Sequence, residues 1–180
     1  MLLLAAWAAL ADTGDSLPAV WKDQHLRLTY LGRTSRYSCD GLREKVRTLL
    51  IELGARRDLK VAAVSCAELG EQLQAGNFIP SVDVSFASPA LPDPAARPRH
   101  AEDAAAVEAR FEPFVITNDA FRNMGMGDCE LVQDFARQIL PKLAVRDVTV
   151  DITCVPHEES GSRYLIRGWV LKPLRGPGRS

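Results

Sequence analysis

Six residues in the second half of the chain have the chemical types that a small active site uses. Arg122, Asn123, Gly125 and Gly127 precede a predicted helix, whose N-terminal N–H groups favour negative charge. His157 and Glu158 closely follow Cys154. A base, a cation and free backbone N–H groups in one loop cluster can hold a small anion or an acyl oxygen. In the structural alternative the glycines shape a turn, the arginine is a solvated charge and the histidine lies in a hairpin loop. The six are Arg122, Asn123, Gly125, Gly127, His157 and Glu158.

Motifs that identify an enzyme directly are missing from the sequence. There is no Gly-x-Ser-x-Gly, His-Glu-x-x-His or phosphate-loop pattern. The other histidines, His25 and His100, fall in a predicted edge strand and in a predicted linker. We therefore expect a binding or interaction protein without catalytic activity and without a cofactor. The alternative is a small hydrolase or anion-binding protein that uses the loop cluster around Arg122 and His157.

Charge and hydropathy narrow the partners and the compartment. The 180 residues include 22 Lys or Arg and 23 Asp or Glu, so the net charge of −1 gives no basic footprint for nucleic acid. Residues 1–11 form an apolar run that closes with Ala9-Leu10-Ala11, which is typical of a secretory signal peptide. No apolar run in the sequence approaches the roughly 20 residues that a membrane-spanning helix needs. We therefore expect a periplasmic or secreted protein without stable membrane insertion. Its partner is expected to be a protein or a small anionic ligand.

The elements that must position the cluster come from an internal similarity between residues 38–66 and 128–154. Five apolar positions match at an offset of 90 residues and recur at helical spacing in both segments. The matching positions are Leu42, Val46, Leu49, Leu50 and Leu53, and then Val132, Ala136, Ile139, Leu140 and Leu143.

The ends of both helices are also predicted. Ser38 and Asp128 are expected N-caps, Gly54 a C-cap, and Pro141 ends the second helix near Leu140. The polar residues of the second helix are assigned to the face opposite its apolar stripe. These residues are Gln133, Asp134, Arg137 and Gln138.

Alternating apolar residues predict strands before and after each helix, and a β-bulge near Ala62. The fold class is therefore α+β, with two tandem βαββ repeats, each an antiparallel or mixed sheet with one packed helix. The predicted divisions are a signal peptide at 1–11, a first repeat at 12–86, an Ala/Pro-rich linker at 87–109 and a second repeat at 110–180.

Four cysteines in an exported chain predict two disulfides. The start of each helix and the end of the following strand meet at one sheet edge, which pairs Cys39 with Cys66 and Cys129 with Cys154. If the two repeats are oriented alike, the same edge gathers four loop segments, 33–37, 67–70, 121–127 and 156–162. Each repeat is then closed by an internal disulfide. A zinc site is the rival interpretation, but these spacings lack the close cysteine pair that zinc uses, so we expect no metal. A thiol redox centre lacks a Cys-x-x-Cys motif.

The last predicted strand offers a second kind of site. If Ile166 and Val170 face inward, then Leu165, Trp169 and Leu171 form a stripe on the outer sheet face. That stripe either binds a partner or packs one repeat against the other, and we favour packing.

Overall fold

The computed structural model describes residues 15–65, 79–92, 106–118 and 123–174. Within these ranges six strands and two α-helices follow one another, with a short 3-10 helix just before α2 and another just after it. In chain order the elements are β1 (Leu17–Thr29), α1 (Cys39–Glu52), β2 (Lys60–Ser65), β3 (Ser81–Ala90), β4 (Ala106–Thr117), η2 (Met126–Asp128), α2 (Cys129–Gln138), η3 (Leu140–Lys142), β5 (Val145–Val155) and β6 (Glu158–Pro173).

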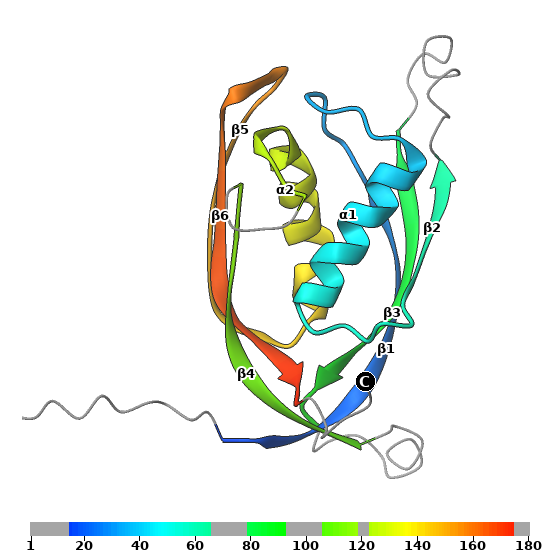
Figure 1. Cartoon of the computed structure of the whole chain (residues 1–180), viewed down its shortest axis with the longest axis vertical. Coiled ribbons are helices and arrows are strands. Elements are labelled where there is room, and N and C mark those ends of the chain that lie inside the picture. The colour runs from blue at the N-terminus through cyan, green and yellow to red at the C-terminus, as the bar shows by residue number, and fades with distance from the viewer. Residues whose placement is uncertain (1–14, 66–78, 93–105, 119–122, 175–180) are drawn as a thin grey trace, which may run out of the picture.

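All six strands belong to one antiparallel sheet in the order β2-β3-β1-β4-β6-β5. The sheet is joined in the middle by a short ladder, in which Leu17–Val20 of β1 pair with Ala106–Ala109 of β4. Beyond this ladder the sheet opens into two arms, β2-β3-β1 and β4-β6-β5. Figure 1 shows the arms curving around both helices.

The predicted fold class of two disulfide-closed repeats is wrong. The β1–β4 pairing makes a single sheet, and one core cluster contains residues from both helices. The one disulfide whose two cysteines are both described joins Cys129 to Cys154. Apolar faces of both helices are buried against each other and the same sheet, so neither half has a core of its own.

That shared core follows from the spacing of apolar residues. Leu42, Val46, Leu49 and Leu50 are fully buried along α1, and Leu131, Val132 and Phe135 along α2. Burying a large apolar side chain contributes about 1.5 to 3 kcal/mol, so this cluster is the main stabilising element. The inner faces of the strands complete it with Leu28, Val84, Ile116, Ile166 and Val170.

The predicted helix ends are partly confirmed. The Ser38 hydroxyl accepts a hydrogen bond from Gly41 N–H, as an N-cap does. Gly54 follows α1 with φ +91°, a left-handed conformation that favours glycine. Pro141 lies in η3, just after α2 ends at Gln138. Asp128 precedes α2 but makes no side-chain cap, because its carboxylate is used elsewhere.

Other boundaries differ from the prediction. The linker is shorter than 87–109, because β3 continues to Ala90 and β4 begins at Ala106. A register shift in β2 lies between Ala63 and Ser65, just beyond the predicted bulge. The predicted signal peptide lies outside the described residues. No helix of the described part of the chain is long and apolar enough to cross a bilayer.

The cysteine pairing is confirmed where it can be followed. Cys129, the first residue of α2, bonds to Cys154 near the end of β5, with an S–S distance of 2.04 Å. Cys39, the first residue of α1, is also disulfide-bonded. Its predicted partner, Cys66, lies outside the described residues.

Candidate functional site

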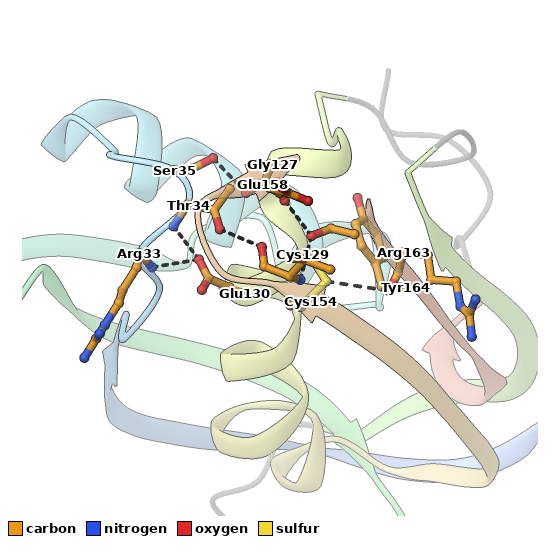
Figure 2. The surroundings of a disulfide bond; sticks show 12 residues. Arg33, Thr34, Ser35, Gly127, Cys129, Glu130, Cys154, Glu158, Arg163 and Tyr164 are labelled. Atoms are coloured by element: carbon orange, nitrogen blue, oxygen red, sulfur yellow. Dashed lines mark hydrogen bonds between the residues drawn. A yellow bond between two sulfur atoms is a disulfide. The ribbon is translucent and has the colours of Figure 1, made fainter. Parts of the chain in front are cut away.

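Three of the loops predicted to converge do meet, at the end of the molecule where β5 turns into β6 (Figures 1 and 2). The Ser35 hydroxyl donates to the Gly127 carbonyl at 2.7 Å. The Thr34 hydroxyl lies 3.4 Å from the Val155 carbonyl and accepts from the His157 N–H at 3.1 Å. The loop after β1 therefore bridges the start of α2 and the β5–β6 turn. The fourth predicted segment, 67–70, lies outside the described residues.

Glu130 in the first turn of α2 organises the loop after β1. Its Oε2 accepts hydrogen bonds from the backbone N–H groups of Arg33 and Thr34, both at 2.7 Å. Figure 2 shows both bonds reaching the same carboxylate beside the disulfide. A carboxylate that accepts backbone N–H bonds makes charge-assisted hydrogen bonds, which are stronger than neutral ones. Glu130 thus fixes the path of this loop.

The same face of α2 continues this role for two more turns. Asp134 Oδ2 accepts from Leu31 N–H at 2.8 Å, and Gln138 bonds to both the N–H and the carbonyl of Thr29 at 3.0 and 2.9 Å. Residues 130, 134 and 138 are each four apart, so they lie on one helix face. We call Glu130, Asp134 and Gln138 the α2 polar stripe.

The polar stripe corrects the prediction for α2. Asp134 was assigned to the face opposite the apolar stripe, but it is only 4% exposed. Burial raises the pKa of Asp134 above its ordinary value, and Glu130 adds to the increase, while the bond from Leu31 N–H and nearby Arg137 oppose it. The physical reason is that β1 and its loop cover this flank of the helix, where their backbone groups need polar partners.

Asp128 is the second organising carboxylate of the cluster. It is 5% exposed and accepts from the Tyr37 hydroxyl at 2.5 Å, from Lys45 Nζ at 2.8 Å and from Gly125 N–H at 2.7 Å. Lys45 belongs to α1, so this carboxylate ties α1 to the segment before α2. A buried charge with a cation and two further donors is well compensated.

Two tyrosines complete the buried part of the cluster. Tyr30 and Tyr37 pack edge to face with their ring centroids 4.9 Å apart. Burial raises the pKa of both hydroxyls, and the carboxylates of Glu130 near Tyr30 and Asp128 near Tyr37 raise them further. Both therefore remain protonated hydrogen-bond donors at neutral pH, and neither is a base.

The predicted site residues have mainly backbone roles where they are described. Asn123 and His157 both adopt positive φ, of 60° and 66°, and the Asn123 carbonyl accepts from Lys45 Nζ. The Gly125 carbonyl accepts from the Tyr164 hydroxyl at 3.1 Å. A Cβ at Gly127 would lie 2.6 Å from Ser35 Oγ, so a larger residue there would displace the Ser35 side chain.

The charged members of the prediction are exposed or lie outside the description. His157 is exposed in the β5–β6 turn and Glu158 is exposed at the start of β6, while Arg122 falls in a range that the structure does not describe. The structure therefore brings together Gly125, Gly127 and the His157 backbone through their loops.

Four backbone N–H groups of these loops are hydrogen-bonded to the protein's own carboxylates. The N–H of Gly125 goes to Asp128, and those of Leu31, Arg33 and Thr34 go to Asp134 and Glu130. Within the described residues no group of three or more His, Cys, Asp or Glu could hold a metal ion. The cluster is thus a hydrogen-bonded joint between loops.

A second surface carries exposed and half-buried apolar side chains together with arginines. We call it the outer face: the outward side chains of β4, β6 and β5, on the side of the sheet away from the helices. Tyr164, Ile166 and Val170 point inward and are buried, so by strand alternation Leu165, Arg167 and Trp169 point outward. The outer face includes Val115, which is 47% exposed, and the half-buried Leu165 and Trp169. Leu171, predicted to belong to it, is itself buried in a small second cluster with Ala19 and Ala109.

Arginines border these apolar residues. The Arg146 guanidinium lies 4.3 Å from the centroid of the Phe111 ring and 5.5 Å from that of Trp169. Arg163 and Arg167 point outward from β6, as their pairing with Thr153 and Thr149 of β5 indicates, and both are exposed. Figure 2 shows the Arg163 side chain extending away from the disulfide. Asp151 of β5 is paired with Leu165, so its carboxylate also points to the outer face.

Sequence reasoning missed Glu130, Asp134 and Gln138 as positioning residues, and it missed the contribution of Phe111 and the arginines to the outer face. The four-residue spacing of three hydrogen-bonding side chains beside an apolar stripe was the signal that could have identified Glu130, Asp134 and Gln138.

Comparisons with protein-family models, with curated proteins and with solved structures found no match for this chain.

Proposed function

We propose that the protein is an exported, disulfide-stabilised binding or interaction protein without catalytic activity, and that it binds its partner through the outer face. The observation that supports this most is the composition of that face. Val115, Leu165 and Trp169 form its apolar part. Arg146, Arg163 and Arg167 lie on the same face, with the carboxylate of Asp151 opposite Leu165.

This composition suits a protein partner with an acidic surface around an apolar patch. Trp and Arg are enriched where binding energy concentrates, and opposite charges across an interface guide association. The Cys129–Cys154 disulfide supports a location in an oxidising compartment, where such bonds persist.

The loop cluster supports this function rather than the hydrolase alternative. Its two buried carboxylates, Asp128 and Asp134, and the tyrosine hydroxyls are bonded within the fold. Such groups position loops, whereas a general base needs a lone pair within reach of a substrate proton.

The test is quantitative capture of partners from the protein's own periplasm or culture medium, with wild type compared with a double variant, Leu165→Ser with Arg167→Glu. The variant should have the wild-type circular dichroism spectrum, and the amount of specifically recovered partner should fall at least about tenfold. Arg137→Glu, a charge reversal on exposed α2 surface, is the control and should leave recovery unchanged. Equal recovery by wild type and the double variant would reject the outer face as the binding surface.

A further inference from the structure

β2 is an edge strand with little to discourage pairing. It bonds to β3 on one side and is the terminal strand of the described sheet, at its right margin in Figure 1. Ala62, Ala63 and Val64 are exposed, and Lys60 is its single charged residue. Edge strands are usually protected by lysines, prolines or strong bulges. β2 has the lysine only at its start and a register shift only at its end, so its middle is available to another strand.

A charged stripe of α1 runs beside this edge. Asp40, Arg43, Glu44 and Arg47 are spaced as neighbours on one helix face, and together with Val61 they line a hollow of about 310 Å³. Arg47 is held in place, since it donates to the carbonyls of Leu59 and Arg57, both at 2.9 Å. The α1 stripe, as we call these four residues, therefore stands beside the start of β2.

The order of charges along the α1 stripe is self-complementary. Read from the N-terminus the signs are minus, plus, minus, plus. When a second copy of the helix runs antiparallel, Asp40 lies opposite the partner's Arg47, and Arg43 lies opposite the partner's Glu44. An isologous interface requires this kind of match, because the same surface patch serves both subunits.

We propose that the occupant of the β2 edge is a second copy of this chain, which pairs β2 with β2 across a two-fold axis and α1 stripe with α1 stripe. A two-fold axis perpendicular to the sheet keeps inward residues opposite inward residues. Val61, which points inward beside Val84, then lies opposite the partner's Ala63, and Ala62 lies opposite the partner's Ala62. The product is a continuous twelve-stranded sheet, and small side chains at its centre allow close approach.

The Arg43–Asp40 ion pair within one copy does not prevent these side chains from pairing with the second copy instead. Arg43 lies 2.9 Å from Asp40, but the two side chains are 47% and 84% exposed, so their net interaction is weak and both can reorient. The β2 edge lies at the opposite end of the sheet from β5 and β6. Dimerisation there leaves the outer face free, and so it is independent of the proposed function.

The test is sedimentation equilibrium of the mature, oxidised protein from about 1 to 300 µM. Wild type should be a reversible dimer. Arg43→Glu and Glu44→Arg each place like charges together twice across the two-fold axis and should raise the dimer dissociation constant by about tenfold or more. The double variant Arg43→Glu with Glu44→Arg restores opposite signs and should recover the wild-type value within about threefold. Arg137→Glu serves as the matched control on α2.

A second variant examines the strand edge. Ala62→Lys adds an outward side chain opposite Asp83 of the same subunit and places two lysines opposite each other at the axis. It should keep the wild-type circular dichroism spectrum and melting temperature and weaken the dimer by more than about tenfold. A monomer throughout the concentration range would overturn the proposal. So would a dimer that is unaffected by Arg43→Glu and Ala62→Lys, or one that is dissociated by Leu165→Ser with Arg167→Glu.

Discussion

Replacing Asp134 by asparagine and by alanine separates its two physical effects on stability. Its buried carboxylate pairs with the N–H of Leu31, but keeping its charge in a site only 4% exposed is costly. Asparagine keeps an oxygen that can accept the hydrogen bond and removes the charge, whereas alanine removes both.

The magnitudes follow from these contacts. Asp134→Ala leaves a partly buried N–H without its acceptor, which costs about 1 to 3 kcal/mol, and relief of the buried charge offsets part of that cost. We expect a net loss of about 1 to 2 kcal/mol at pH 7. Asp134→Asn should change the free energy of unfolding by no more than about 0.5 kcal/mol in the destabilising direction, or increase it.

The pH dependence has a definite sign. The pKa of Asp134 is raised in the folded state above its ordinary value of 3.8, so the folded protein holds this proton more tightly than the unfolded chain. Its contribution to stability is therefore complete below pH 3.8 and is lost as the pH rises through the folded pKa. The free energy of unfolding of Asp134→Asn minus that of wild type should accordingly increase from pH 3.5 to pH 7.

Urea denaturation followed by circular dichroism, at several pH values, measures all three proteins. Glu52→Gln, at an exposed position at the end of α1, is the matched control for removing a negative charge. The reasoning is refuted if Asp134→Asn is as destabilising as Asp134→Ala at pH 7, or if its advantage over wild type shrinks as the pH rises.

Three further perturbations test other parts of the structure. Replacing Cys129 and Cys154 together by serine opens a loop with a sequence separation of 25 residues and should lower the free energy of unfolding by about 3 to 4 kcal/mol, as measured by urea denaturation; a loss below about 1 kcal/mol contradicts this. Lys45→Met removes the cation from buried Asp128 and should cost about 2 kcal/mol in the same assay, whereas Lys142→Met at an exposed position should cost little. Gly54→Ala forces a side chain to φ +91° with its Cβ 3.1 Å from Lys172 Cγ, so the melting temperature should fall by several degrees, whereas Gly125→Ala, with open space around its Cβ, should change it less.

Local patterns predicted the parts of the fold that depend on local physics. Apolar spacing located α1 and α2, Ser38 identified a true N-cap, and the positions of helix starts and strand ends paired Cys129 with Cys154. Each of these depends on residues close in sequence or on the lengths of two neighbouring elements.

The arrangement of strands into a sheet was not predictable in this way. Alternation predicts that β1 and β4 are strands but does not say that Leu17–Val20 pair with Ala106–Ala109, about 90 residues away. The role of Asp134 was missed for a related reason. A polar residue beside an apolar stripe is expected to face water, and only tertiary contact with Leu31 shows that it does not.

The short ladder between β1 and β4 has a mechanical consequence. It spans four residue pairs and includes Pro18, which has no N–H to donate, so main-chain bonding between the arms is sparse. If the two arms were pulled apart, the packed side chains of the two helices would carry most of the force. The hydrogen bonds between β1 and β4 would break first. The mechanical rigidity of the molecule thus depends more on the packed helices than on the β-sheet.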